Sequence, residues 1–100
     1  MAKTVVDRDR ILRAIEQCLI ALNEDRSRDE QIPLTEGTLL LDDESPLDSL
    51  SFVSFATDLE GRLRELTDAP LQAVSDLWSD PKAVRDVGTL TDNLSILLNK

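Results

Sequence analysis

An aspartate followed by a serine, Asp48-Ser49, is the pair of residues in this sequence best placed to do chemistry. The pair follows Pro46 and precedes apolar residues at spacings of three and four, which predicts that a helix begins there. Asp48 or Ser49 can cap that helix, because a short polar side chain accepts a hydrogen bond from an otherwise unpaired N–H. Ser49 is then an accessible hydroxyl at a helix N-terminus, where free N–H groups and the helix dipole favour a phosphate. The stretch predicts that a prosthetic group is attached to Ser49.

The sequence has no histidine and a single cysteine, Cys18. The absence of histidine removes the commonest general base and the commonest transition-metal ligand, so a Ser-His-Asp triad and a His-containing zinc site are excluded. Cys18 has no partner for an internal disulfide and falls within an amphipathic pattern, where a small core residue is expected. We therefore expect no catalytic residue, no metal site and no enzyme activity. Ser49 would be the substrate of another enzyme.

Charge is distributed unevenly along the chain. The formal net charge is -9, from 20 acidic and 11 basic residues, and no lysine or arginine lies between Asp29 and Gly61. That window holds nine acids: Asp29, Glu30, Glu36, Asp42, Asp43, Glu44, Asp48, Asp58 and Glu60. The remaining 11 acids balance the 11 bases, so the whole net charge lies around Ser49. Such a surface repels nucleic acid and attracts basic protein surfaces, although a cluster of this kind is usually only a solvated face.

Length and hydrophobic periodicity predict one all-α domain over residues 1–100. The hydrophobic fraction of 41% suffices for a single core, which must be aliphatic because only three residues are aromatic. The first helix is expected over residues 4–23, from a start signal at Thr4 and Asp7, after a frayed N-terminus. Its inward stripe is Ile11, Leu12, Ile15, Cys18, Leu19 and Leu22. We expect no membrane span, no signal peptide and a cytoplasmic location.

The rest of the chain is predicted to form a long loop and further helices. Residues 24–47 read as a loop pinned to the core by Leu34 and residues 39–41, with a lone β-strand as the alternative. The second helix is expected over residues 49–66, with Gly61 inside it. A short third helix is expected over residues 71–78. A further start at Asp80-Pro81 leads into residues 82–87, and Gly88 separates the last helix. The result is a small four-helix bundle with a long first loop and an extra short helix before the last two.

Around Ser49 the sequence resembles the acyl carrier protein family. The resemblance is carried by Leu47-Asp48-Ser49-Leu50, by Phe52-Val53 and Phe55-Ala56, and by the acidic surroundings. It extends more loosely to the first helix, the long loop and the closing segment Val87-Gly88-Thr89-Leu90. In that family the serine carries 4′-phosphopantetheine, which a separate Mg²⁺-dependent phosphopantetheinyl transferase transfers from coenzyme A. The thiol of the arm holds cargo as a thioester.

The resemblance implies roles for particular residues. Ser49 would be the attachment site, and Asp48 would help to orient the phosphate, its metal and the transferase. Leu50 and Val53 would be apolar contacts for partner enzymes. Further partner-binding positions implied in this way are Asp42, Asp43, Glu44 and Thr57. The implied partners are the transferase, an acyl- or aminoacyl-loading ligase and downstream enzymes with basic docking surfaces, all meeting a monomer transiently.

Departures from the family pattern indicate a specialised member. Pro46 stands near a position where glycine is usual, and acids are usual where this chain has Ser51, Ser54 and Arg62. The resemblance places a cargo pocket at Phe52, Ala56, Leu59 and Val87. Because the rings of Phe52 and Phe55 would fill part of that pocket, we hypothesise that long acyl chains are poorly sequestered.

Two other interpretations of Ser49 remain open. The chain could be a small acidic helical protein-interaction module in which Ser49 is only a helix N-cap. Ser49 could also be a phosphorylation site, although the surrounding acids make a further negative charge costly. Within the carrier interpretation, a fatty acid, a polyketide, an amino acid or a lipid-modifying group would all use the same serine.

Overall fold

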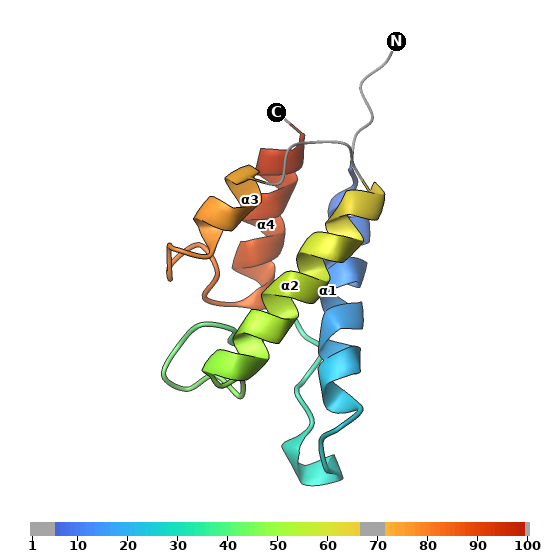
Figure 1. Cartoon of the computed structure of the whole chain (residues 1–100), viewed down its shortest axis with the longest axis vertical. Helices are drawn as coiled ribbons and strands as arrows, with labels where there is room; N and C mark the ends of the chain where they lie inside the picture. The colour runs from blue at the N-terminus through green and yellow to red at the C-terminus, as the bar shows by residue number, and fades with distance from the viewer. Residues whose placement is uncertain (1–5, 67–71, 100) are drawn as a thin grey trace.

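The computed structural model describes residues 6–66 and 72–99 of the chain. Within them lie four α-helices, α1 (Arg8–Asn23), α2 (Ser49–Leu66), α3 (Gln72–Leu77) and α4 (Val87–Leu98), and a short 3-10 turn, η1 (Arg28–Glu30). In Figure 1 the long helices α1, α2 and α4 form the body of the bundle, and the connection from α1 to α2 turns at its lower end. α1 packs against both α2 and α4, and α3 lies against α4. A small all-α bundle is therefore confirmed.

The core is aliphatic with one phenylalanine, as the composition predicted. Each long helix buries a stripe at spacings of three and four, because such residues share one face of a helix. The stripes are Ile11, Ile15, Cys18 and Leu19 on α1, Phe55, Leu59 and Leu63 on α2, and Val87, Leu90, Leu94 and Leu98 on α4. Burying a side chain of this size stabilises the fold by about 1.5–3 kcal/mol, which is why the three stripes decide the packing.

Aspartates occupy the N-cap positions of α1 and α4, but only the one before α4 caps its helix with its side chain. α1 begins at Arg8, with Asp7 in the N-cap position, so the predicted start at residue 4 is too early by several residues; Thr4 itself lies outside the described residues. α4 begins at Val87, because the Asp86 carboxylate accepts a hydrogen bond from the backbone N–H of Thr89 at 2.7 Å. Gly88 therefore lies in the first turn of α4 and does not separate it from an earlier element, contrary to the prediction.

The helix predicted over residues 82–87 is absent from the described structure, where residues 81–84 form a turn. The Asp80 side chain accepts a hydrogen bond from the N–H of Lys82 at 3.1 Å, which fixes the turn locally. The backbone then pairs with the long loop, since the N–H of Leu40 donates to the carbonyl of Arg85 at 2.7 Å and the N–H of Val87 to that of Thr38 at 3.0 Å. These long-range bonds take the place of helical ones.

The long loop is held to the bundle at points that the sequence predicted only in part. Leu40 is buried as expected, but Leu34 is exposed, so its predicted anchoring is wrong; Ile32 is buried in its place. The side chain of Asn23 holds Ile32 by its backbone, accepting from the Ile32 N–H at 2.7 Å and donating to the Ile32 carbonyl at 3.1 Å. The alternative of a lone strand reduces to one isolated antiparallel bridge, between Leu39 and Asp86.

No helix in residues 6–66 and 72–99 is both long and apolar enough to cross a membrane.

Candidate functional site

Ser49 is the first residue of α2 and is exposed. Asp48, just before it, caps the helix: its carboxylate accepts a hydrogen bond from the backbone N–H of Ser51 at 2.7 Å, and its carbonyl accepts one from the N–H of Phe52 at 2.9 Å. Of the two predicted caps, Asp48 is the one used. The Ser49 hydroxyl is thus presented beside the free N-terminal N–H groups of an 18-residue helix.

Capping also changes the acidity of Asp48. The hydrogen bond from the Ser51 N–H stabilises the carboxylate and holds the pKa of Asp48 below its ordinary value, and the nearby guanidinium of Arg26 acts in the same direction. The charged form is therefore maintained next to Ser49 at neutral pH. A carboxylate fixed in this way can orient a cation or a donor brought by a partner, but nothing in the sequence supplies the histidine that could activate the serine.

The segment that leads into Ser49 is fixed by Ser45. Its hydroxyl lies 2.9 Å from the carbonyl oxygens of both Leu39 and Leu40, and it accepts a hydrogen bond from the N–H of Leu47 at 3.0 Å. Leu47 is buried, so this bond and the buried side chain hold the end of the loop against the bundle. The sequence did not predict this structural role of Ser45, because the carbonyl oxygens that accept its hydrogen bonds lie five and six residues earlier in an irregular segment.

Ser49 lies on the wall of a surface groove of about 660 Å³. The groove runs between the long loop, the start of α2 and the turn after α3. Its lining residues are Leu40, Leu41, Asp42, Asp43, Leu47, Asp48, Ser49, Phe52, Val53, Trp78 and Pro81. The lining combines apolar side chains with three carboxylates, so the groove suits a flexible chain with both polar and apolar parts. Its size lies within the range of pockets that take ligands of moderate size.

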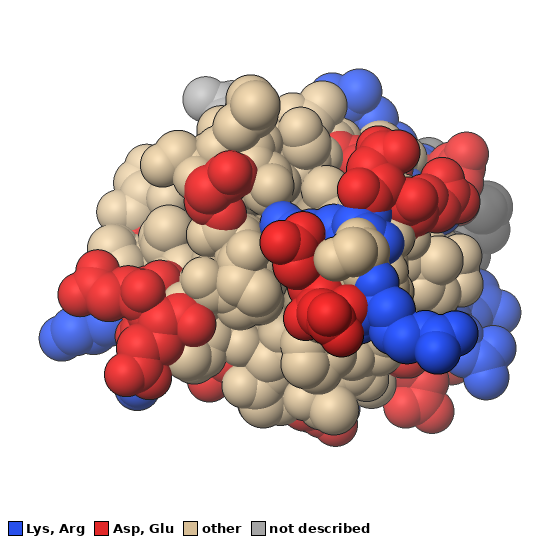
Figure 2. All heavy atoms as spheres, turned by 90° about the horizontal axis from the view of Figure 1, so that it is seen from below, with Lys and Arg blue, Asp and Glu red and all other residues tan. Residues whose placement is uncertain are grey.

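Two arginines from outside the acidic window reach this end of the molecule. The Arg26 guanidinium lies 3.3 Å from the carbonyl of Pro46 and 3.4 Å from the Ser51 hydroxyl, and Arg85 pairs with Asp42 at 3.3 Å. Figure 2 shows this lower end with carboxylates in several groups and basic side chains between them. The acidic window is therefore free of lysine and arginine in the sequence, but its surface is not, because folding brings arginines from before and after the window next to it.

The residues predicted to bind partners lie on two sides of Ser49. Leu50 and Val53 on α2 are 75% and 59% exposed, and Thr57 follows them on the same helix and is also exposed. In the loop, Asp43 and Glu44 are exposed, whereas Asp42 is partly covered and lines the groove. The structure thus presents an apolar pair with carboxylates beside it.

The four residues of the predicted cargo pocket are not equally accessible. Phe52 lines the groove, whereas Leu59 and Val87 are fully buried in the core and Ala56 is partly covered. The groove reaches only the first of the four. It is also bordered by Trp78, which was not among the predicted site residues; the available signal was a tryptophan two residues before Asp80-Pro81.

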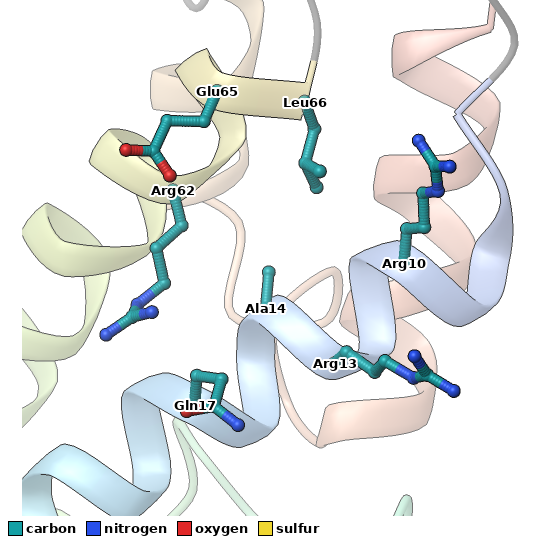
Figure 3. Close-up of a pocket in the computed structure, with 7 residues that line it drawn as sticks. All are labelled: Arg10, Arg13, Ala14, Gln17, Arg62, Glu65 and Leu66. Atoms are coloured by element: carbon teal, nitrogen blue, oxygen red, sulfur yellow. The ribbon is translucent and has the colours of Figure 1, made fainter.

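A second hollow, of about 300 Å³, lies at the other end of α2 (Figure 3). Leu66 and Ala14 face one another across it, and three arginines, Arg10, Arg13 and Arg62, stand around it. Their guanidinium groups point apart, and that of Arg62 pairs with Asp58 at 3.1 Å. The charged groups around this hollow do not converge on a common point, so it has the form of a gap between two helices. Among residues 6–66 and 72–99, no group of three or more Cys, Asp or Glu side chains is arranged to hold a metal ion.

No protein-family model, curated protein or solved structure matches this chain. What can be said of its function comes from the residues at the start of α2 and from the groove beside them.

Proposed function

We propose that this protein is an acyl carrier protein, which holds an acyl or aminoacyl group as a thioester on a 4′-phosphopantetheine arm attached to Ser49. The observation that carries the proposal is the position of Ser49: an exposed hydroxyl on the first residue of α2, directly after a carboxylate that caps the helix. A hydroxyl so placed is accessible to another enzyme, and the sequence has no histidine that could act on it as a general base.

The surroundings of Ser49 fit such an arm. A phosphodiester on the hydroxyl would lie at a helix N-terminus, where unpaired N–H groups and the helix dipole favour an anion. The groove beginning at Ser49 offers Phe52, Val53 and Trp78 to the apolar parts of the arm and its cargo. The arm itself supplies the thiol that carries the cargo. Tethering raises the local concentration of that thioester at each partner's active site, without a tight binding site for the cargo.

The proposed partners are a phosphopantetheinyl transferase, a loading ligase and acyl-transferring enzymes that approach this end of the molecule. Leu50 and Val53 are exposed side by side on α2, where an apolar contact on a partner could cover them. The carboxylates of Asp43 and Glu44 nearby favour a partner with a basic rim. We propose that these encounters are transient, that the carrier is a monomer and that it works in the cytoplasm.

Enzymatic modification tests the proposal. The purified protein is incubated with coenzyme A, Mg²⁺ and a phosphopantetheinyl transferase of broad specificity, and the intact mass is recorded. We expect the mass to rise by one phosphopantetheinyl group. Ser49→Ala should remain unmodified, and Ser54→Ala should be modified like the wild type, because Ser54 is an exposed serine of the same helix. Failure of the wild type under conditions that modify a known carrier would refute the proposal.

A thiol assay gives an independent measure. Cys18 is the only cysteine, is 1% exposed, and has a pKa raised to about 12 by burial, so it should be unreactive in the folded protein. Before modification the native protein should therefore show no fast reaction with a thiol reagent, and after modification one equivalent, from the arm. Denaturation should expose Cys18 in both forms.

A protein-interaction module remains the second candidate. The exposure of Leu50 and Val53 supports it equally well, since apolar pairs of this kind mark binding surfaces in general. In that case Asp48 and Ser49 would only start the helix, and the transferase would leave the wild type unmodified. The mass measurement therefore separates the two candidates.

A further inference from the structure

Trp78 joins α2 to the segment that follows α3. Its indole N–H donates a hydrogen bond to the Glu60 carboxylate on α2 at 2.8 Å, and the hydroxyl of Ser75 lies 3.5 Å from the same oxygen. The indole ring meets the ring of Phe52 edge-on, with the centroids 6.0 Å apart and the planes at 86°. Phe52 in turn lies 6.2 Å from Phe55, whose side chain is fully buried. A row of three aromatic rings therefore extends from the groove into the core.

This row separates the groove from the interior of the bundle. Phe52 and Trp78 both line the groove and both pack against the core cluster, so one side of each ring faces the groove and the other faces buried side chains. A chain entering the space between α2 and α3 from Ser49 would have to displace the indole and break its bond to Glu60. Edge-on aromatic contacts stabilise a packed pair beyond area burial, and a hydrogen bond to a charged group adds to that resistance.

We propose that Trp78, held by Glu60 and Phe52, is the residue that determines cargo specificity: it confines cargo on the arm to the surface groove and so selects short acyl or aminoacyl groups over long acyl chains. This inference rests on the proposed function, because it assumes an arm on Ser49. It goes further in naming the cargo class and the side chain that sets it. Short cargo packs against the groove face of the indole, and a long chain extends past the groove into solvent.

The fluorescence of Trp78 provides the readout, since it is the only tryptophan in the chain. The transferase loads the wild type with butyryl or dodecanoyl phosphopantetheine from the corresponding acyl-coenzyme A, and intact mass confirms each product. We expect the butyryl form to show weaker acrylamide quenching and a blue-shifted emission relative to the unacylated form. Dodecanoyl should add no further protection and should raise the melting temperature no more than butyryl, because only groups bound to the folded state stabilise it.

Variants at Trp78 and Glu60 test the barrier itself. In Trp78→Ala the dodecanoyl group should raise the melting temperature more than butyryl does, because truncation opens the path between α2 and α3. Glu60→Ala keeps the ring but removes its acceptor, so it should show the same length dependence to a smaller extent and stronger quenching of Trp78 in the unloaded protein. Glu65→Ala is the matched control, an exposed acid of the same helix outside the groove lining, and should behave like the wild type.

The outcomes separate the two proposals. A wild type that gains no mass refutes the carrier function and this inference with it. If the wild type is modified but dodecanoyl stabilises the fold more than butyryl does, the role of Trp78 alone is refuted. The same holds if neither acyl group makes Trp78 less accessible than it is in the unacylated form. If Trp78→Ala does not fold, Glu60→Ala and Trp78→Phe decide: equal stabilisation by both acyl groups in both variants counts against the barrier.

Discussion

At its Ser49 end, α2 is bordered by a groove whose walls are fixed by hydrogen bonds, whereas at its Leu66 end it borders a hollow whose side chains point apart. About 25 Å of helix separate the two ends, given a rise of 1.5 Å per residue. The first end has Asp48 as a cap, Ser45 holding the loop, and Trp78 bonded to Glu60. At the second end, Leu66 faces Ala14, and the guanidinium groups of the surrounding arginines point away from one another.

The difference indicates which hollow is a prepared site. Binding is favoured where polar and apolar groups are already held in place, because less conformational freedom is lost when a ligand arrives. At the groove beside Ser49, groups are held in place by the Asp48 cap, by the hydrogen bond from Leu47 to Ser45 and by the hydrogen bond from Trp78 to Glu60. The hollow at Leu66 does not meet this condition, because long arginine side chains would have to reorient and lose rotamer freedom before they could act together. The groove at Ser49 is therefore the better candidate because its side chains are already held in place, and not only because it is the larger hollow.

The largest effect should come from the core beneath each end. Phe55→Ala should reduce the free energy of unfolding by about 3–5 kcal/mol, and Leu63→Ala by about 2–5 kcal/mol, because both side chains are fully buried. Only Phe55→Ala should also change the emission of Trp78, through loss of support for Phe52. Chemical denaturation and fluorescence measure the two effects. Equal changes of emission in both variants would show that the aromatic row is not specific to the Ser49 end.

Loss of the Ser45 hydroxyl should have the next largest effect. Ser45→Ala leaves the N–H of Leu47 without its acceptor, which should cost about 1–2 kcal/mol of unfolding free energy. Hydrogen exchange should be faster at the amides of Ser45, Leu47 and Asp48, with little change at Leu63 and Leu66. Ser54→Ala, at an exposed helical position, serves as the control and should stay within about 0.5 kcal/mol of the wild type. Unchanged exchange at these three amides would show that the loop is held by the Leu47 side chain alone.

Two glycines provide a smaller contrast. A Cβ at Gly61, in α2, would meet nothing within 4 Å, so Gly61→Ala should stabilise the protein by about 0.5–1 kcal/mol through helix propensity. A Cβ at Gly88 would lie 3.2 Å from the carbonyl oxygen of Glu36, so Gly88→Ala should lose that gain against the crowding of the loop. Thermal unfolding measures both. A stabilised Gly88→Ala would mean that the loop retreats from α4 at little cost.

The sequence predicted the helices better than the groove, for a physical reason. Helical stripes and an aspartate cap depend on residues within four positions of one another, so α2 was placed from Ser49 to Leu66 without error. The irregular segments depend on distant partners, such as Leu40 with Arg85 or Asn23 with Ile32, and no local pattern announces these. The same holds for Arg26 near Asp48 and for Trp78 near Phe52. The position of Ser49 at the start of α2 was predicted from local pattern, whereas the other residues that line its groove were not all predicted.

The smallest effect concerns the charge of Asp48. Because hydrogen bonding lowers the pKa of this carboxylate in the folded state, its contribution to stability is present above its unfolded pKa of about 3.9 and is lost as the pH falls through the folded value. Asp48→Asn keeps a capping side chain without the titrating group. It should therefore lose less stability than the wild type between about pH 6 and pH 3, a range that spans the unfolded pKa. Melting temperatures across that range measure the difference.

Asp43→Asn, at an exposed acid of the same loop whose side chain accepts no hydrogen bond from the described residues, should follow the wild type. If the two variants give the same profile, Asp48 is no more strongly coupled to folding than its neighbours, and the Ser49 end is fixed by Ser45 and Trp78 instead.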